Sequence, residues 1–183
     1  MPHVIEPAAS SRAKCRGCNG KIEQGALRFG ERQPNAFGDG EMTLWFHLDC
    51  AAFKRPEPLL ELLGAGPTDV LSGDEAARLQ AVAERGVEHR RLPRIDGGER
   101  AATGRARCRH CRELIARGDW RIPLVFFEEY RFEPAGFVHA ACVRAYFGTA
   151  DVLDRVRYFN RELDDAAATE LAAAIAAGPD RPA

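Results

Sequence analysis

All six cysteines of this chain belong to one arrangement that occurs twice. Each copy opens with Cys-x2-Cys and closes with His-x2-Cys, with 28 residues between the two pairs in the first copy and 27 in the second. Thiolates and an imidazole are ligands that Zn²⁺ favours, and three cysteines with one histidine complete its tetrahedral shell. The predicted zinc ligands are Cys15, Cys18, His47 and Cys50 in the first copy, and Cys108, Cys111, His139 and Cys142 in the second.

The full ligand set indicates structural zinc. Four protein ligands leave no open position for water or substrate, so we expect two structural Zn²⁺ ions per chain. Six unrelated buried thiols would be the alternative, but two complete sets leave no cysteine over. The His-x-Glu and Pro-Cys-x-x-Cys signature of zinc deaminases is absent, and the gap between ligand pairs exceeds the roughly 12 residues of a DNA-reading ββα finger. With no Gly-rich phosphate loop and no credible triad, we expect no catalytic residues and no enzyme activity.

The repeat extends beyond the ligands. An arginine stands three residues before the first ligand of each copy, another stands thirteen residues after it, and an aromatic residue stands two before the histidine. The leucines Leu71 and Leu79 recur 92 residues later as Leu163 and Leu171. We therefore expect a tandem repeat of about 92 residues: a first module over residues 10–93, a linker over 94–102, where Asp96-Gly97-Gly98-Glu99 has linker composition, and a second module over 103–178.

The elements that must position the ligands follow from local patterns. Alternation predicts strands over residues 26–32 and 42–47, and over 121–127 and 130–138. A short helix should follow each histidine, over 48–54 and 140–147. Further helices are expected from the capping box at Ser72–Glu75 to a stop at Gly86, and over 164–177. The fold class is α+β, with two small zinc-clamped modules in tandem, each a short antiparallel sheet plus helices.

Composition narrows the setting of the protein. Apolar residues make up 45% and charged residues 29%, which is typical of a folded chain, and the net charge is −1. Of the 26 basic residues 23 are arginine, which suits phosphate binding but also follows from GC-rich coding. The apolar runs are far shorter than the roughly 20 residues of a membrane helix, and the first residues do not form a signal peptide. We expect no membrane partner, and a place in the cytoplasm at the nucleoid if bacterial or in the nucleus if eukaryotic.

Taken together, Arg-x2-Cys-x2-Cys, Leu-Arg and Trp-Phe-His-x2-Cys resemble the PARP-type zinc finger, the DNA strand-break-sensing finger of poly(ADP-ribose) polymerase and of one eukaryotic DNA ligase. The resemblance covers roughly residues 10–86 and 103–178. The second copy is looser, because Phe137 replaces the tryptophan and one residue is missing between the ligand pairs. The resemblance implies sequence-independent binding of nicks and ends, in which side chains stack on an exposed base pair and arginines hold nearby phosphates.

The resemblance also assigns residues to these roles. It gives phosphate contacts to Arg12, Arg28, Arg105 and Arg121, and base stacking in the first copy to Phe37 and Met42. In the second copy the stacking stretch falls on residues 130–134, where Tyr130 and Phe132 both remain candidates. Trp45 and Phe137 should pack beside the zinc. Acidic residues near each stacking loop would weaken binding if they faced phosphate: Glu31, Asp39 and Glu41 in the first copy, and Glu128, Glu129 and Glu133 in the second.

Two functions remain open from the sequence. The first is a monomeric sensor of DNA strand breaks that passes the break to a repair enzyme. The alternative is a zinc-clamped protein-interaction adaptor without DNA binding. Exposure of the stacking candidates beside the arginines would favour DNA, and burial of those side chains would favour the adaptor.

Overall fold

The computed structural model describes residues 3–35, 38–66 and 69–178. The chain divides into two compact units, Met1–Glu88 and His89–Ala183. Each unit contains a three-stranded antiparallel sheet, several helices and one Cys3His cluster. This confirms the α+β fold class. Among the described helices, none is both long and apolar enough to cross a membrane.

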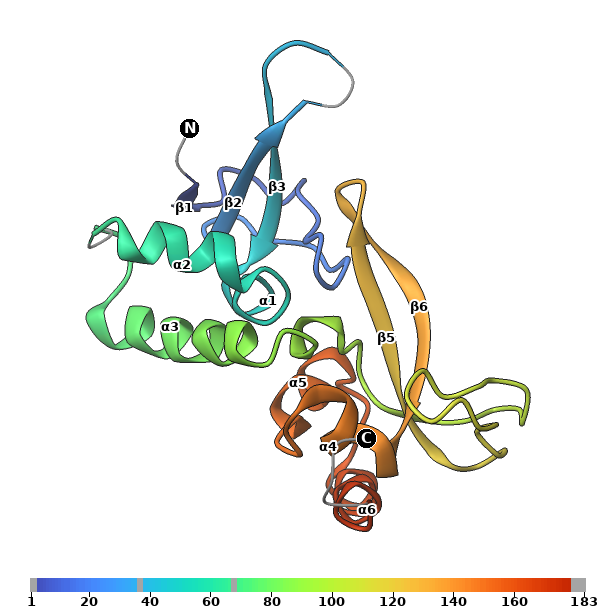
Figure 1. Cartoon of the computed structure of the whole chain (residues 1–183). Helices are drawn as coiled ribbons and strands as arrows, with labels where there is room; N and C mark the ends of the chain where they lie inside the picture. Colours follow the sequence, from blue (N-terminus) through green and yellow to red (C-terminus); the bar gives the residue numbers. More distant parts are fainter. Residues whose placement is uncertain (1–2, 36–37, 67–68, 179–183) are drawn as a thin grey trace. The chain divides into compact units, whose positions relative to one another are not determined.

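In the first unit the sheet has the order β1 (Val4–Pro7), β2 (Leu27–Pro34) and β3 (Glu41–His47). Three helices follow, α1 (Leu48–Lys54), α2 (Pro56–Gly64) and α3 (Gly73–Glu88), and the β2–β3 hairpin projects beyond them (Figure 1). Phe29, Leu44 and Phe46 on the strands are fully buried, as are Leu59 and Leu79 on the helices. Burial of these apolar side chains between sheet and helices stabilises the unit.

The second unit repeats this plan. Its sheet has the order β4 (Glu99–Arg100), β5 (Trp120–Glu128) and β6 (Arg131–His139). The helical elements are η1 (Leu92–Arg94), η2 (Ala140–Cys142), α4 (Val143–Phe147), α5 (Leu153–Phe159) and α6 (Asp165–Ala176). In Figure 1 the long β5–β6 hairpin rises from the end of the unit at which α4 and α6 gather. The repeat extends into the core, where Leu79 of α3 and Leu171 of α6, 92 residues apart, are both fully buried.

Residues 94–102, expected to be a linker, lie inside the second unit. Ile95 and Ala101 are buried in its core, and β4 pairs with the start of β5. The glycines that give this segment a linker composition are required by packing. A Cβ on Gly98 would lie 2.8 Å from Cγ1 of Val156, so glycine lets the segment before β4 approach α5 closely.

The other element predictions are mostly confirmed, with shifts of one or two residues at the ends. The helix over residues 48–54 has the predicted bounds, and the Ser72 hydroxyl accepts a hydrogen bond from the Glu75 N–H at 3.2 Å as the capping box requires. The stop at Gly86 is wrong: Gly86 is buried within α3, which continues to Glu88. The expected helix over 140–147 begins as the 3-10 turn η2 before α4.

Candidate functional site

The first predicted zinc cluster is assembled by three elements. Cys15 and Cys18 lie on a tight turn in which the Cys15 N–H donates to the Gly20 carbonyl at 2.8 Å. His47 ends β3, and Cys50 lies in α1, which begins one residue after His47. The four ligand atoms all lie within 4.8 Å of one another, which is the spacing of donors around one metal ion.

The second cluster has the same construction. Cys108 and Cys111 lie on a turn in which the Cys108 N–H donates to the Glu113 carbonyl at 2.9 Å, while His139 ends β6 and Cys142 closes η2. Their ligand atoms also lie within 4.8 Å of one another. Both turns need one residue in the left-handed region, Asn19 with φ 57° and Arg112 with φ 69°. The chain therefore has the two Cys3His zinc-binding sites that the sequence predicted.

Each histidine is oriented by a backbone carbonyl. Nδ1 of His47 lies 3.4 Å from Sγ of Cys18, and its Nε2 lies 3.1 Å from the Lys21 carbonyl oxygen. Nδ1 of His139 lies 3.4 Å from Sγ of Cys111, and its Nε2 lies 3.2 Å from the Leu114 carbonyl oxygen. An Nε2–H that donates to a carbonyl fixes the tautomer, so Nδ1 is the nitrogen that each ring offers to zinc.

The cysteine thiols of each cluster lie close enough to shift one another's pKa values. Hydrogen bonds with Cys15 and Cys50 hold the pKa of Cys18 far below the usual thiol value. Burial opposes ionisation of Cys108, but backbone N–H donors, led by that of His139, outweigh it and lower its pKa to about 7. Burial and the neighbouring Cys108 raise the pKa of Cys142 to about 12. Each cluster thus has one thiol with a lowered pKa, Cys18 in the first and Cys108 in the second, and a bound Zn²⁺ would stabilise the other cysteines as thiolates.

Beside the first zinc site, three charged or ligating side chains form a row across the sheet. Glu6, Arg28 and His47 are paired in register on β1, β2 and β3. Nη2 of Arg28 donates to Oε1 of Glu6 at 2.6 Å, and the guanidinium carbon lies 3.5 Å from the ring centroid of Trp45. Only 11% of the Arg28 side chain is exposed. The guanidinium is thus held by a carboxylate at its edge and by an indole on its face.

The second unit repeats this row. Glu99, Arg121 and His139 are paired in register on β4, β5 and β6. Nε and Nη2 of Arg121 donate to Oε1 of Glu99 at 2.8 and 2.5 Å, and its guanidinium carbon lies 3.6 Å from the ring centroid of Phe137. Trp45 and Phe137 therefore pack on these arginines, two residues before the zinc-ligating histidines.

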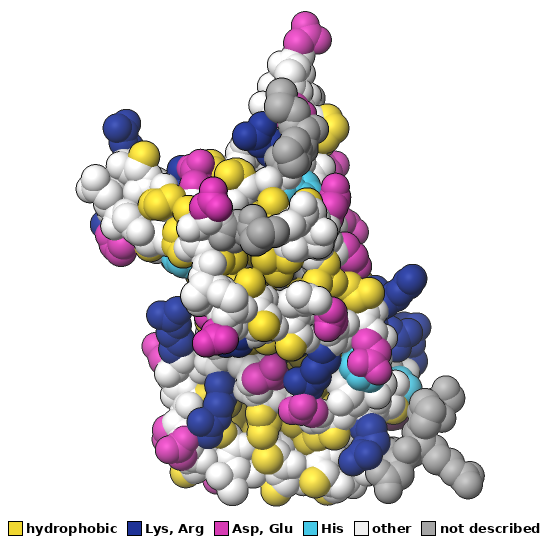
Figure 2. Space-filling view, turned by 90° about the vertical axis from the view of Figure 1, so that its left-hand side faces the viewer, with side chains coloured by type: hydrophobic (Ala, Val, Ile, Leu, Met, Phe, Trp, Pro, Cys, Tyr) yellow, Lys and Arg dark blue, Asp and Glu magenta, His cyan; other side chains and the backbone are white. Residues whose placement is uncertain are grey.

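The other two arginines predicted to contact phosphate are more exposed than Arg28 and Arg121. Arg12 and Arg105 are exposed on the segments that lead into the two cysteine turns. Within the described parts of the chain, neither has an ion pair that would hold its guanidinium in place. On the face shown in Figure 2, basic and acidic side chains are interspersed over the surface.

The two stacking candidates of the second unit lie in different elements: Tyr130 in the turn of the β5–β6 hairpin and Phe132 on β6. Tyr130 was expected to start a strand, but β6 begins at Arg131, and Glu129 and Tyr130 form the two-residue turn with φ of 47° and 66°. Phe132 lies on β6 opposite Phe127, with 4.9 Å between the ring centroids. Tyr130 and Phe132 are both half-buried, and the ring of Phe132 packs against that of Phe127.

The first hairpin is described only in part. Phe37 lies outside the described residues. Met42 is half-buried on β3, opposite Gln33. Of the acidic residues near this loop, Glu31 is fully buried and accepts two hydrogen bonds from Arg55, at 2.7 and 2.5 Å. Glu31 therefore does not face a phosphate bound at the surface, because its carboxylate is fully buried.

The remaining acidic residues are on the surface or paired. Asp39, Glu41, Glu128 and Glu129 are exposed. Glu133 forms an ion pair with Arg131. These carboxylates contribute negative charge at the hairpin ends, where solvent screens it.

Sequence reasoning missed Glu6 and Glu99. A signal was present, because each glutamate stands nine residues before the first ligand of its copy, just as each arginine stands thirteen after it. The segments around the glutamates have no strand-like alternation, since Pro7 and two glycines interrupt them. Both glutamates therefore lie outside the modules that the sequence predicts over residues 10–93 and 103–178.

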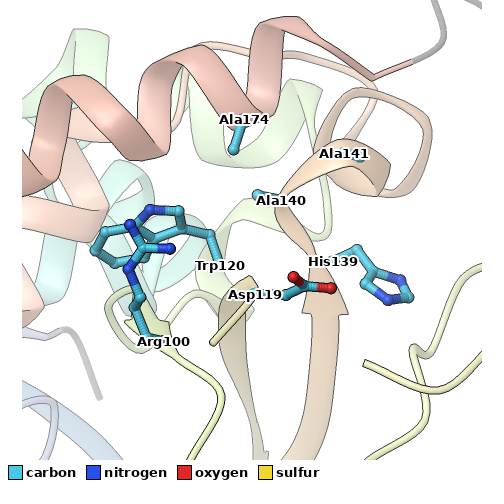
Figure 3. A pocket seen from close by; sticks show the side chains of 7 residues that line it. All are labelled: Arg100, Asp119, Trp120, His139, Ala140, Ala141 and Ala174. Carbon is cyan, nitrogen blue, oxygen red and sulfur yellow. The ribbon is translucent and has the colours of Figure 1, made fainter. Parts of the chain in front are cut away.

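The second unit also contains a cavity of about 290 Å³ beside His139 (Figure 3). Arg100 lies over the ring of Trp120, with its guanidinium carbon 4.5 Å from the ring centroid, on one side of the cavity; Asp119 and His139 lie on the other. Ala140, Ala141 and Ala174 complete the lining. At the positions 92 residues earlier the first unit has the larger side chains Leu48, Asp49 and Val82.

Comparison with known proteins agrees with this construction. The family model described as "Poly(ADP-ribose) polymerase and DNA-Ligase Zn-finger region" matches residues 6–73. The chain is 29% identical over 146 residues to a poly [ADP-ribose] polymerase of Sarcophaga peregrina, covering 70% of this chain and 14% of that protein. It is 25% identical over 179 residues to polynucleotide 3'-phosphatase ZDP of Arabidopsis thaliana, covering 85% of this chain and 26% of that protein.

A shorter match reaches higher identity. A poly [ADP-ribose] polymerase 1 of Caenorhabditis elegans is 40% identical over 50 residues, which is 27% of this chain and 5% of that protein. The chain thus spans about a quarter or less of the length of these relatives. With the family model on the first unit, a second Cys3His site in the second, and polymerase relatives over most of the sequence, the chain is a PARP-type zinc finger protein.

Proposed function

We propose that this protein binds DNA at strand breaks, both nicks and ends, without reading base sequence, and that it acts in DNA repair. Fingers of the poly(ADP-ribose) polymerase and DNA-ligase family generally bind DNA breaks, and the first unit matches that family. The observation that carries the proposal is the arginine fixed beside each zinc site, stacked on Trp45 in one unit and on Phe137 in the other. Two such arginines in tandem suit the phosphates on the two sides of a break.

Phosphate contacts would come from two kinds of arginine. Arg28 and Arg121 are held in one orientation, which lowers the entropy lost on binding. Arg12 and Arg105 are exposed, and their side chains would form ion pairs with phosphates of the DNA backbone. Neutralising phosphate in this way is independent of base sequence and strongly dependent on salt.

Stacking would supply the selectivity for a break. A base pair exposes its face only where the duplex is interrupted, and an aromatic side chain stacks on any base. Tyr130, at the tip of the β5–β6 hairpin, is our candidate in the second unit, because the ring of Phe132 already contacts Phe127. Phe37 and Met42 are the candidates in the first unit.

The closed zinc shells support a binding role rather than catalysis. We propose that the chemistry of repair belongs to a partner enzyme to which the break is passed. The protein would act as a monomer where broken DNA occurs, in the nucleus of a eukaryote or at the nucleoid of a bacterium.

One observation favours the alternative, an adaptor without DNA binding. Arg28 and Arg121 already have carboxylate partners, and an arginine that only stabilises the fold would be paired in the same way. The test uses one oligonucleotide prepared as intact, nicked, gapped and blunt-ended duplex, with hairpins closing the other ends. Fluorescence anisotropy with the zinc-loaded chain should give a clear preference for the interrupted forms, whereas an adaptor would bind none of them.

A further inference from the structure

Both units place a glutamate on the first strand directly beside the arginine that stacks on the aromatic ring. Glu6 is paired in register with Arg28, and Glu99 with Arg121. The arrangement is repeated although neighbouring residues differ, since Trp45 is replaced by Phe137 and Pro7 by Arg100. A contact that persists when its surroundings change points to a role for the contact itself.

The glutamate determines which part of the guanidinium remains available. In the first unit it accepts from Nη2 of Arg28, and in the second from Nε and Nη2 of Arg121. The aromatic ring covers one face of each guanidinium. Among the described residues, Nη1 of both arginines has no hydrogen-bond partner. Nε of Arg28 is buried and that of Arg121 is bound to Glu99, so Nη1 is the group of each held guanidinium that could donate to a phosphate oxygen.

We propose that Glu6 and Glu99 are positioning residues: each orients its arginine so that the free Nη1 edge grips a phosphate beside the break. This inference rests on the proposed function. The carboxylate would have two opposing effects on DNA binding: it orients the arginine, which strengthens binding, and its negative charge repels phosphate, which weakens binding. Glu6 and Glu99 are 40% and 45% exposed, so solvent screens that repulsion, while the contact that orients the arginine is short.

The two effects predict opposite outcomes when the carboxylate is removed. If Glu6 only repels phosphate, Glu6→Ala tightens binding. If Glu6 positions Arg28, Glu6→Ala weakens binding of nicked duplex by about three- to tenfold, and it lowers the salt dependence as loss of one phosphate contact does. Glu6→Gln keeps an oxygen that accepts from Nη2, and it should recover most of the affinity.

A double-mutant cycle on the full zinc-loaded chain tests this directly. Affinities for nicked and intact duplex are measured for wild type, Glu6→Ala, Arg28→Ala and the double variant, with zinc content as the check on folding. We expect Glu6→Ala to change affinity less than about twofold once Arg28 is absent. Glu57→Ala, which removes an exposed carboxylate from α2, is the matched charge control and should leave the affinity and salt dependence nearly unchanged.

Tighter or unchanged binding by Glu6→Ala, or an equal loss with and without Arg28, overturns the positioning role while leaving break binding intact. A wild-type chain that does not distinguish nicked from intact duplex overturns the proposed function as well. If Glu6→Ala loses zinc, the same cycle with Glu99→Ala, Glu99→Gln and Arg121→Ala decides the question in the second unit.

Discussion

Arg28 lies directly opposite the zinc ligand His47 where β2 pairs with β3. The strand pair that carries the metal site therefore also carries the arginine we assign to phosphate. Trp45, two residues before His47, forms the surface on which that arginine rests. The zinc site and the phosphate contact that we propose for Arg28 would therefore be coupled through one short stretch of backbone, and loss of the metal should also release the arginine.

Removal of one zinc ligand should unfold one unit and spare the other. A structural zinc site contributes about 10–16 kcal/mol of apparent binding free energy, which a small unit cannot replace. We expect two zinc ions per wild-type chain, and one in Cys50→Ala and in Cys142→Ala. Trp45 and Trp120 lie in different units, so tryptophan fluorescence together with metal analysis identifies which unit is lost. A folded variant chain that keeps both ions would contradict the assignment of ligands.

Replacement of the stacked arginines should weaken binding to all DNA forms. Arg28→Ala and Arg121→Ala each remove a phosphate contact, so the slope of log affinity against log salt should fall by about one unit for each. Arg28→Lys should not restore affinity, because an ammonium group lacks the planar fork that both Glu6 and Trp45 hold. Arg90→Ala, at an exposed position, is the control. Equal salt slopes for the wild type and Arg28→Ala would argue against a phosphate contact.

Substitutions at the tip of the second hairpin should separate stacking from stability. Tyr130→Ala should weaken binding of nicked duplex by about 1–3 kcal/mol and barely change binding to intact duplex. Tyr130→Gly should lose the same selectivity while raising the melting temperature, because glycine adopts a φ of 66° without strain. Phe132→Ala should instead lower the melting temperature through loss of the contact with Phe127. The reverse pattern, with Phe132→Ala alone losing selectivity, would transfer the stacking role to Phe132.

Breaking the buried ion pair of the first unit should affect stability and not recognition. Glu31→Ala leaves Arg55 without its two hydrogen bonds in a mostly buried place, which should cost about 3–5 kcal/mol of unfolding free energy. The preference for nicked over intact duplex should persist wherever the variant remains folded, since Glu31 is buried. Denaturant unfolding and anisotropy on the same sample measure both quantities. A gain of affinity for DNA in Glu31→Ala would instead indicate that this carboxylate repels bound DNA.

The zinc ligands and the main strands were predictable because few arrangements satisfy them. Paired cysteines and a His-x2-Cys at a strand–helix junction define a metal site by chemistry alone, and β2, β3, β5 and β6 carry clear patterns. The strands β1 and β4 were not predicted, because they contain four and two residues and their pairing partners are distant in sequence. Tertiary pairing, not local propensity, makes them strands.

Other departures have equally local reasons. The composition around Gly97 and Gly98 predicts a linker. In the structure these glycines instead allow close packing against Asn160 and Val156. Glu129 and Tyr130 are unusual for a two-residue turn, which normally uses Asn or Gly for positive φ. Composition therefore predicts strand at Tyr130, while the β5–β6 register imposes the turn. The strain of that turn is itself a reason to examine Tyr130 as a functional residue.

The most direct measurement compares the affinity of the zinc-loaded chain for two DNA molecules of identical sequence, one intact with hairpins at both ends and one with a single nick. Both are titrated at moderate salt by fluorescence anisotropy, so that the weak contribution of phosphate alone is the same for each. We predict that the nicked molecule binds at least about tenfold more tightly, as stacking on an opened base pair requires. Equal affinity for the two molecules would contradict strand-break recognition and leave a general duplex binder or, with no binding at all, an adaptor.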